Sequence, residues 1–235
     1  MDHNPFGNIF NVNTLSDLNH LHIDSIQMRF GNKLLLSDIY LACKKGEILG
    51  ILGRNGSGKS TLLKIIHKSL TAENRFVRAG KHVLLSEAAT IRHLAYLPQE
   101  NFLPGHLKII KAIRAFVPPE NLDKVINLPS VKASLNKKPY EISKGTQRFI
   151  ETVITIHAQQ DYILLDEPFA GNSPVNCEIL AGLIKEQRSH KGFIITDHNY
   201  RTVYDIATRI VLLHHGSIKQ ITERNDLVRW GYLPG

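Results

Sequence analysis

The sequence predicts an α/β fold with a mostly parallel β-sheet covered by helices on both faces, and three observations predict it. After residue 47, apolar segments of strand length alternate with segments of helical spacing, the order that builds a parallel sheet. Before residue 47, apolar segments follow one another across hairpin-type turns, which favours an antiparallel β-subdomain on the N-terminal side. Between residues 101 and 142, five prolines separate short helical segments and indicate a small inserted helical subdomain.

The composition allows a single domain with a substantial core, because 43% of the 235 residues are hydrophobic. No stretch approaches the roughly 20 apolar residues that span a bilayer. The N-terminus lacks the basic region and apolar run of a secretion signal. Cys43 and Cys177 lie far apart without metal-ligand spacing, which favours two buried small residues over a disulfide or a metal site. We therefore expect a soluble intracellular protein.

The formal charge of +8 raises the question of an anionic partner. The lysines and arginines are scattered in short pairs such as Lys44-Lys45 and Lys137-Lys138. No basic run or interleaving of basic and aromatic residues resembles a nucleic-acid surface. We interpret most of these charges as solvated surface and expect no nucleic-acid partner.

The first part of the chain divides at residue 20. Residues 1–20 are polar and Asn-rich, and we expect them to form an N-terminal extension. Residues 21–235 are then one domain. The domain is expected to begin with antiparallel strands at residues 21–30, 33–36 and 39–43. A further strand at residues 47–52 follows them.

Strands and helices alternate over the rest of the domain. Predicted strands cover residues 76–77, 82–85, 94–97, 161–166, 192–197, 209–213 and 217–221. Predicted helices cover residues 60–67, 106–116, 120–127, 144–159, 176–190 and 200–207. The helical subdomain extends over approximately residues 101–159.

The most informative segment is GRNGSGKST at residues 53–61, which matches G-x-x-x-x-G-K-[ST] between a strand and a helix. Glycines let the backbone curl so that several N–H groups point at one anion, and the helix N-terminus adds partial positive charge. Lys59 is expected to reach the β- and γ-phosphates, and the Ser60 hydroxyl to bind Mg²⁺. The pattern predicts a P-loop NTPase core, with nucleotide bound by Gly53, Arg54, Asn55, Gly56, Ser57, Gly58, Lys59, Ser60 and Thr61.

Two acids follow an apolar strand that ends at Asp166. Ligands of open α/β sheets bind at the carboxyl ends of the strands, so Asp166 and Glu167 are expected beside the phosphate loop. Neighbouring strand residues point in different directions, which gives the two acids different tasks. Asp166 would hold Mg²⁺, directly or through water, and Glu167 would polarise the attacking water.

Three further patterns accompany the phosphate loop and the acids. Residues 96–99 (YLPQ) precede the helical subdomain, residues 142–148 (ISKGTQR) open the long helix, and residues 194–198 (IITDH) close a strand. With this order and approximate spacing, the chain resembles the ATP-binding cassette family, the nucleotide-binding subunits of membrane transporters. The resemblance covers about residues 21–221, and we name residues 142–148 the signature segment after it.

The resemblance implies further roles. Gln99 is similar to the glutamine that senses the γ-phosphate through Mg²⁺ and water, beside the surface where a transmembrane partner docks. His198 is similar to the switch histidine that contacts the γ-phosphate, which makes it a catalytic candidate together with Glu167 and Lys59. Ser143 and Gly145 resemble the ATP-binding signature. Phe30 falls where the family has an aromatic side chain stacked on adenine, although a core strand aromatic explains it equally well.

The chain departs from the family pattern at three places. Lys144 stands where the signature usually has its first glycine, a variant that resembles export-type cassettes. Ser173 replaces the aspartate that links the two active sites of a dimer, so communication between sites is in question. The stretch between Gln99 and Ser143 is short, which predicts a trimmed helical subdomain.

The resemblance implies an ATPase, dependent on ATP and Mg²⁺, that drives transmembrane permease subunits from the cytoplasmic face of the membrane. Two chains, as a homodimer or cassette heterodimer, would sandwich two ATP molecules, with Ser143 serving the other subunit's site. One alternative is a cassette ATPase acting on nucleic acid or the ribosome, but this chain lacks the second cassette or coiled-coil insertion typical of that class. The other is a nucleotide-binding regulator without hydrolysis.

Overall fold

The computed structural model describes residues 19–234. The prediction of an N-terminal extension therefore falls almost entirely outside the described residues. A six-stranded sheet has the order β10-β9-β3-β8-β7-β6, in which every pair is parallel except β9 with β10. Its strands are β3 (Ile48–Leu52), β6 (Leu94–Leu97), β7 (Tyr162–Asp166), β8 (Gly192–Thr196), β9 (Arg209–His214) and β10 (Ser217–Ile221).

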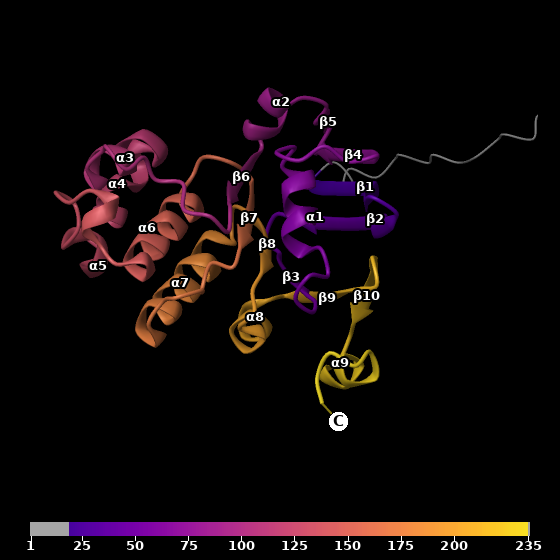
Figure 1. The fold of residues 1–235 in the computed structure, drawn as a ribbon. Helices are drawn as coiled ribbons and strands as arrows, with labels where there is room; N and C mark the ends of the chain where they lie inside the picture. The colour runs from indigo at the N-terminus through magenta and orange to yellow at the C-terminus, as the bar shows by residue number, and fades with distance from the viewer. Residues whose placement is uncertain (1–18, 235) are drawn as a thin grey trace, which may run out of the picture.

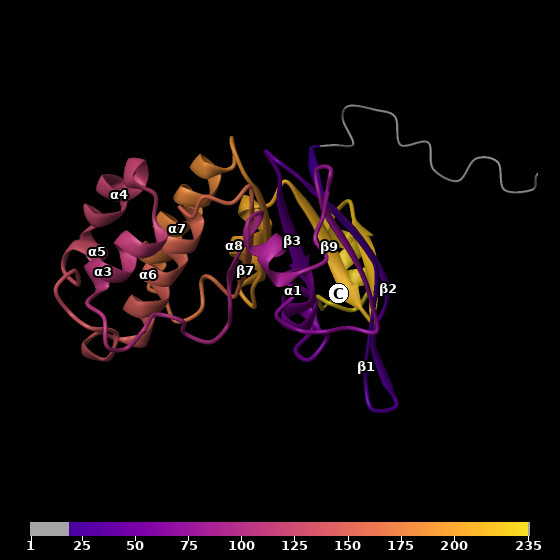
Figure 2. The same ribbon diagram turned by 90° about the horizontal axis from the view of Figure 1, so that it is seen from above.

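Helices cover one face of this sheet, as Figures 1 and 2 show. Because β3, β7 and β8 are buried along their whole length, both faces of the sheet need a cover. Side chains of the covering helices join those of the strands in one apolar core. The covering helices are α6 (Lys144–Ile156), α7 (Pro174–Gln187) and α8 (Tyr200–Ile206).

The opposite face packs on α1 (Lys59–Ile66) and on a four-stranded antiparallel sheet, which together form a second apolar core. The order of the antiparallel sheet is β2-β1-β4-β5. Its strands are β1 (His20–Phe30), β2 (Lys33–Lys44), β4 (Asn74–Ala79) and β5 (His82–Val83). The predicted fold class is confirmed in all its parts: parallel core, antiparallel β-subdomain and inserted helices.

The inserted helices stand beyond α6, at the far side of the molecule from the antiparallel sheet (Figure 2). They are α3 (Ile109–Phe116), α4 (Pro119–Ile126) and α5 (Pro129–Lys132). Pro119 and Pro129 lie in the first turns of α4 and α5. Proline is tolerated there because the N–H that it lacks would have no partner within the helix. Backbone bonds from Ile109 N to Lys137 O (2.9 Å) and Ile110 N to Leu135 O (3.0 Å) close the insertion on itself.

Two details differ from the sequence-based expectation. The predicted break between residues 36 and 39 is wrong, because β2 runs through it with Asp38 at a φ of 49° and an irregular register against β1. Three short helices were not predicted: α2 (Glu87–Ile91), α5 and α9 (Arg224–Arg229). Helices this short are set by caps and packing, not by periodicity; α2, for example, begins where the Ser86 hydroxyl accepts a bond from Ala89 N (3.1 Å).

Candidate functional site

The phosphate loop leaves β3 and enters α1 through backbone conformations that glycine adopts freely. Gly56 has a φ of 74° and Gly58 a φ of 104°, both in the left-handed region. Gly53 admits no side chain, since a Cβ there would lie 2.9 Å from Leu213 O. The Lys59 ammonium folds back across the loop and donates to the carbonyls of Gly53 (2.8 Å) and Arg54 (3.3 Å). The loop is therefore already curled around its lysine.

The loop forms one side of a cavity of about 340 Å³. Gln99, Glu167 and His198 line the opposite side, although they come from three separate segments. They meet because β6, β7 and β8 are neighbours in the sheet and their carboxyl ends share one edge. The cavity is lined by Leu35, Asn55, Gly56, Ser57, Gly58, Lys59, Ser60, Thr61, Gln99, Glu167 and His198.

Asp166 lies at the base of the site with only 1% of its surface exposed. Its Oδ1 accepts hydrogen bonds from the hydroxyls of Ser60 (3.0 Å) and Thr196 (2.7 Å), and the Tyr96 hydroxyl lies 3.4 Å from Oδ2. Burial raises the pKa of this carboxyl, while the bonds from Thr196 and Ser60 oppose the rise. Burial likewise lowers the pKa of the Lys59 ammonium against the attraction of Glu167 and Asp166.

Glu167 is the point on which the polar side chains of the cavity converge. Its Oε1 lies 2.8 Å from His198 Nε2 and accepts a bond from Gln99 Nε2 (3.2 Å). Its backbone has a φ of 56°, an unfavourable conformation for a residue with a Cβ, and its N–H donates to Thr196 O (2.7 Å). Strained backbone of this kind persists where the surroundings hold it and is frequent at active sites.

The residues present suit a magnesium nucleotide. The Ser57 hydroxyl is buried and lacks a hydrogen-bond partner in the described part of the chain. Residues 19–234 contain no cluster of three or more His, Cys, Asp or Glu residues arranged to hold a metal. Mg²⁺ does not require one, since it usually takes one or two protein oxygens and completes its shell with phosphate and water. Ser60 and Asp166 supply such oxygens beside the loop.

Five predicted nucleotide ligands do not line this cavity. Gly53 and Arg54 belong to the loop, and Arg54 lines a second cavity described below; Ser143, Gly145 and Phe30 lie elsewhere. The Ser143 hydroxyl caps α6, accepting from Thr146 N (3.1 Å). Gly145 packs on the backbone of Gly171, where a Cβ would lie 2.3 Å from the Gly171 carbonyl oxygen. Phe30 is 54% exposed at the end of β1. The roles of Ser143, Gly145 and Phe30 in nucleotide binding remain predictions.

Sequence reasoning missed three residues of the site. Thr196 ends β8 and Tyr96 lies on β6, and both reach Asp166. Arg148 lies on α6 and its guanidinium donates to main-chain carbonyls of both strand ends. The polar end of the buried strand β8 was a usable signal for Thr196. Tyr96 and Arg148 lie within the YLPQ and ISKGTQR patterns, but their contacts with the end of β7 cannot be derived from either pattern.

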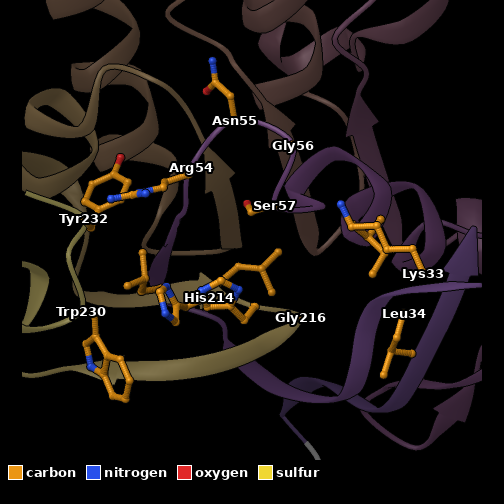
Figure 3. A pocket seen from close by; sticks show the side chains of 14 residues that line it. Lys33, Leu34, Arg54, Asn55, Gly56, Ser57, His214, Gly216, Trp230 and Tyr232 are labelled. Atoms are coloured by element: carbon orange, nitrogen blue, oxygen red, sulfur yellow. The ribbon is translucent and has the colours of Figure 1, made fainter.

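A second cavity of about 290 Å³ borders the first and shares Asn55, Gly56 and Ser57 of the phosphate loop with it (Figure 3). Its ionisable lining is basic or aromatic and comes from the start of β2, the β9–β10 turn and the segment after α9. Arg54 crosses toward Tyr232 and donates to Gly231 O (2.6 Å). The C-terminal segment is thus joined directly to the phosphate loop.

The family model described as ABC transporter matches residues 36–170, more than half of the chain. The chain belongs to the ABC transporter family. The match includes the phosphate loop, Gln99, the signature segment and both acids. Within the family the chain corresponds to the ATP-binding subunit, since the names of its similar proteins are those of ATP-binding proteins and of an export system's ATP-binding component. The nucleic-acid alternative finds no support among them.

Similar proteins cover most of the chain at moderate identity. An uncharacterized ABC transporter ATP-binding protein of Methanocaldococcus jannaschii is 26% identical over 89% of this chain and 82% of its own length. The lipopolysaccharide export system ATP-binding protein LptB of Haemophilus influenzae is 28% identical over 84% and 88%. The human ATP-binding cassette sub-family A member 13 is 32% identical over 81% of this chain, which spans about 4% of that protein.

A solved ATP-binding subunit of an ABC transporter has the same fold. Its TM-score with this chain is 0.79, and the match covers 92% of this chain and 94% of that subunit at 22% identity.

The buried carboxylate leads to a stability prediction for the nucleotide-free protein in chelator. Because burial raises the folded-state pKa of Asp166, the free energy of unfolding falls as pH rises from the ordinary aspartate pKa through the raised one. Asp166→Asn removes this penalty, so we expect a higher Tm than wild type at pH 7 and a difference that shrinks toward about pH 4. Thermal melts across this range measure it. Asp161→Asn, which alters a half-exposed ion pair with Lys45, is the control; an equal gain there would contradict the assignment.

Proposed function

We propose that this chain hydrolyses ATP and thereby drives a separate transmembrane partner. One observation supports it above the others: the phosphate loop faces the Gln99–Glu167–His198 group across a single cavity. The buried Asp166 lies beneath it, bonded to the hydroxyl of Ser60. An anion-binding loop alone would fit any nucleotide-binding protein. A carboxylate opposite the loop, held by a histidine and an amide, fits a protein that also acts on the terminal phosphate.

Binding depends on the loop and on Lys59. The main-chain N–H groups of residues 56–61 and the N-terminus of α1 provide positive potential for phosphate oxygens. Lys59 would exchange its bonds to the Gly53 and Arg54 carbonyls for bonds to the β- and γ-phosphates. Since the loop is already folded, little reorganisation accompanies binding.

Ser60 and Asp166 would hold Mg²⁺, with Gln99 in its outer shell. When bound, the ion neutralises charge on the phosphate oxygens and helps to align the terminal phosphate. The residues of this chain prepare its place: Thr196 and Ser60 fix Oδ1 of Asp166, and Tyr96 lies beside Oδ2.

Glu167 would orient the attacking water for in-line displacement at the γ-phosphate. In such reactions positioning and charge stabilisation supply most of the rate enhancement. Gln99 and His198 fix the direction of the Glu167 carboxylate before the nucleotide arrives. His198 would then share its Nε2 proton with the γ-phosphate oxygen as negative charge moves outward.

Two chains, or this chain and a similar cassette, would form the complete site. Ser143 and Gly145 lie outside their own chain's cavity, as a segment that serves a neighbour's nucleotide should. Nucleotide between two cassettes would favour the closed dimer, and hydrolysis would allow it to reopen.

The transmembrane partner would dock on an apolar groove of about 750 Å³ between the core and the helical subdomain. Phe102 and Phe116 form one wall with their rings 5.8 Å apart, and Phe116 is 47% exposed. No helix within residues 19–234 is both long and apolar enough to cross a bilayer, so the chain's described part needs such a surface to reach one. Because Phe102 and Gln99 belong to the same short loop, a segment in the groove would act directly on the cavity.

Lys59→Ala should weaken ATP binding by about 10- to 100-fold, the loss expected when a charge-assisted bond disappears. Isothermal titration with ATP measures the Kd. The control is Lys64→Ala, later on the same helix and paired with Glu100 at 3.3 Å. An unchanged Kd for the Lys59 variant would remove the phosphate-loop assignment.

Glu167→Gln should keep the ATP Kd within about threefold and lower kcat by about 10²- to 10⁴-fold, because the amide no longer activates water. The variant should then accumulate as an ATP-dependent dimer in gel filtration. Glu178→Gln, on an exposed position of α7, should behave as wild type. Wild-type turnover by the Glu167 variant would show that another group is catalytic.

Phe116→Ser should leave the ATP Kd unchanged and reduce association with membranes, since it places a hydroxyl in the apolar groove. Sedimentation of purified protein with washed membrane vesicles from the cells that produce it measures the bound fraction. Tyr140→Ser changes an aromatic residue that is 72% exposed and outside the groove, and should sediment as wild type. Equal sedimentation of both variants and wild type would contradict this docking surface.

A further inference from the structure

The buried arginine of the signature segment joins two strand ends of the catalytic edge. Arg148 is 5% exposed, and its guanidinium donates to the carbonyls of Pro98 (2.6 Å), Glu167 (3.2 Å) and Asp166. Pro98 follows β6, Asp166 ends β7, and Glu167 follows β7. A planar guanidinium with donors in a fixed fork holds such carbonyls at a fixed separation.

These carbonyls lie in or next to the residues whose side chains must point into the cavity, Gln99 and Glu167. Pro98 immediately precedes Gln99, and the Glu167 backbone occupies the left-handed region with a φ of 56°. Thr196 O holds the Glu167 N–H at 2.7 Å, and Arg148 holds its carbonyl. The strained conformation that aims the Glu167 side chain at Gln99 and His198 therefore depends on a bond from each side.

The same helix begins at the surface assigned to the neighbouring cassette. Ser143 caps α6, and Arg148 lies five residues later, an axial rise of about 7.5 Å. Gly145 is packed directly on Gly171, in the loop that carries Ser173. Displacement of the first turn of α6 would therefore move the guanidinium that holds Glu167.

We propose that Arg148 is a positioning residue that couples the signature segment to the catalytic carboxylate of its own chain. The coupling rests on the proposed function, because it presumes that nucleotide in the neighbouring site contacts the first turn of α6. It offers a route between sites that does not use position 173, where this chain has serine. Arg148 itself lines no part of the cavity and would not contact the nucleotide.

A second arginine, half-buried on β4, provides a control with the same kind of main-chain bonds. Arg75 also donates to three main-chain carbonyls, those of Ile65 (2.7 Å), Ile66 (2.7 Å) and Leu84 (2.6 Å). It holds the C-terminal end of α1, at the opposite end of the helix from the phosphate loop. Burial lowers the pKa of both guanidinium groups, to about 10 for Arg75. The two residues thus share a pattern of three main-chain bonds and differ in what they hold. Arg148 also lies 4.0 Å from the buried Glu151 carboxylate, whose charge the Arg148→Lys variant can still neutralise.

The experiment compares Arg148→Lys with Arg75→Lys in the full chain. Lysine keeps the charge and loses the fork. Both variants should have a lower Tm than wild type, because each loses the fork that holds three main-chain carbonyls. Only Arg148→Lys should lower kcat, by about 10- to 100-fold, because the carboxylate is displaced while the loop is intact. Its ATP Kd should stay within about threefold of wild type, and any cooperativity of turnover in ATP should disappear.

Equal kcat losses in the two variants would overturn the inference, as would an unchanged kcat for Arg148→Lys or a parallel loss of ATP affinity. A wild-type chain that binds ATP without hydrolysing it would contradict the proposed function instead. In that case hydrogen exchange tests the role of Arg148 without turnover. The amides of residues 99 and 167 should exchange at least about tenfold faster in Arg148→Lys than in Arg75→Lys. Equal exchange would overturn the inference.

Discussion

The buried carboxylate of Asp166 sets the conditions for the rest of the site. A carboxylate with 1% exposure is stable only if neighbours supply donors, and here they come from α1 and β8, with a tyrosine hydroxyl of β6 close by. Each of those elements also carries part of the machinery: α1 follows the phosphate loop, β8 leads to His198 and β6 leads to Gln99. Satisfying one buried charge therefore aligns three segments that are distant in sequence.

Three residues of the site have unfavourable backbone or ionisation properties that their surroundings maintain. Glu167 has a backbone conformation that L-residues avoid, Asp166 has a raised pKa, and Lys59 has a lowered one. Each feature reduces stability and is tolerated because the sheet, the Arg148 guanidinium and the apolar cores on both faces hold it. A preorganised site of this kind needs little rearrangement when a charged ligand arrives, which is an advantage in catalysis based on electrostatics.

The apolar groove and the cavity beside the phosphate loop share a wall. Tyr96 lines the groove with its ring and lies beside Asp166 with its hydroxyl, and the loop from Gln99 to Phe102 borders both spaces. Glu151, buried in α6, accepts bonds from the amides of Phe102 (2.9 Å) and Leu103 (3.1 Å) and so ties that loop to the signature helix. The apolar groove is therefore mechanically continuous with the loop that carries Gln99 into the cavity.

The sequence by itself determined what depends on local order. The phosphate loop needs glycines at fixed spacing, buried parallel strands are apolar throughout, and Asp166 and Glu167 follow such a strand. Residue order therefore predicted the parallel core, the inserted helices and a site formed by the loop and the two acids, while the places of Gln99 and His198 followed from the family resemblance. Only the tertiary structure decided which side chains reach across elements. Arg148 and Tyr96 act through contacts with residues 18 and 70 positions away, and no period or spacing encodes such a contact. The short helices α2, α5 and α9 and the unbroken β2 were likewise decided by packing, because local propensity over so few residues is too weak to specify them.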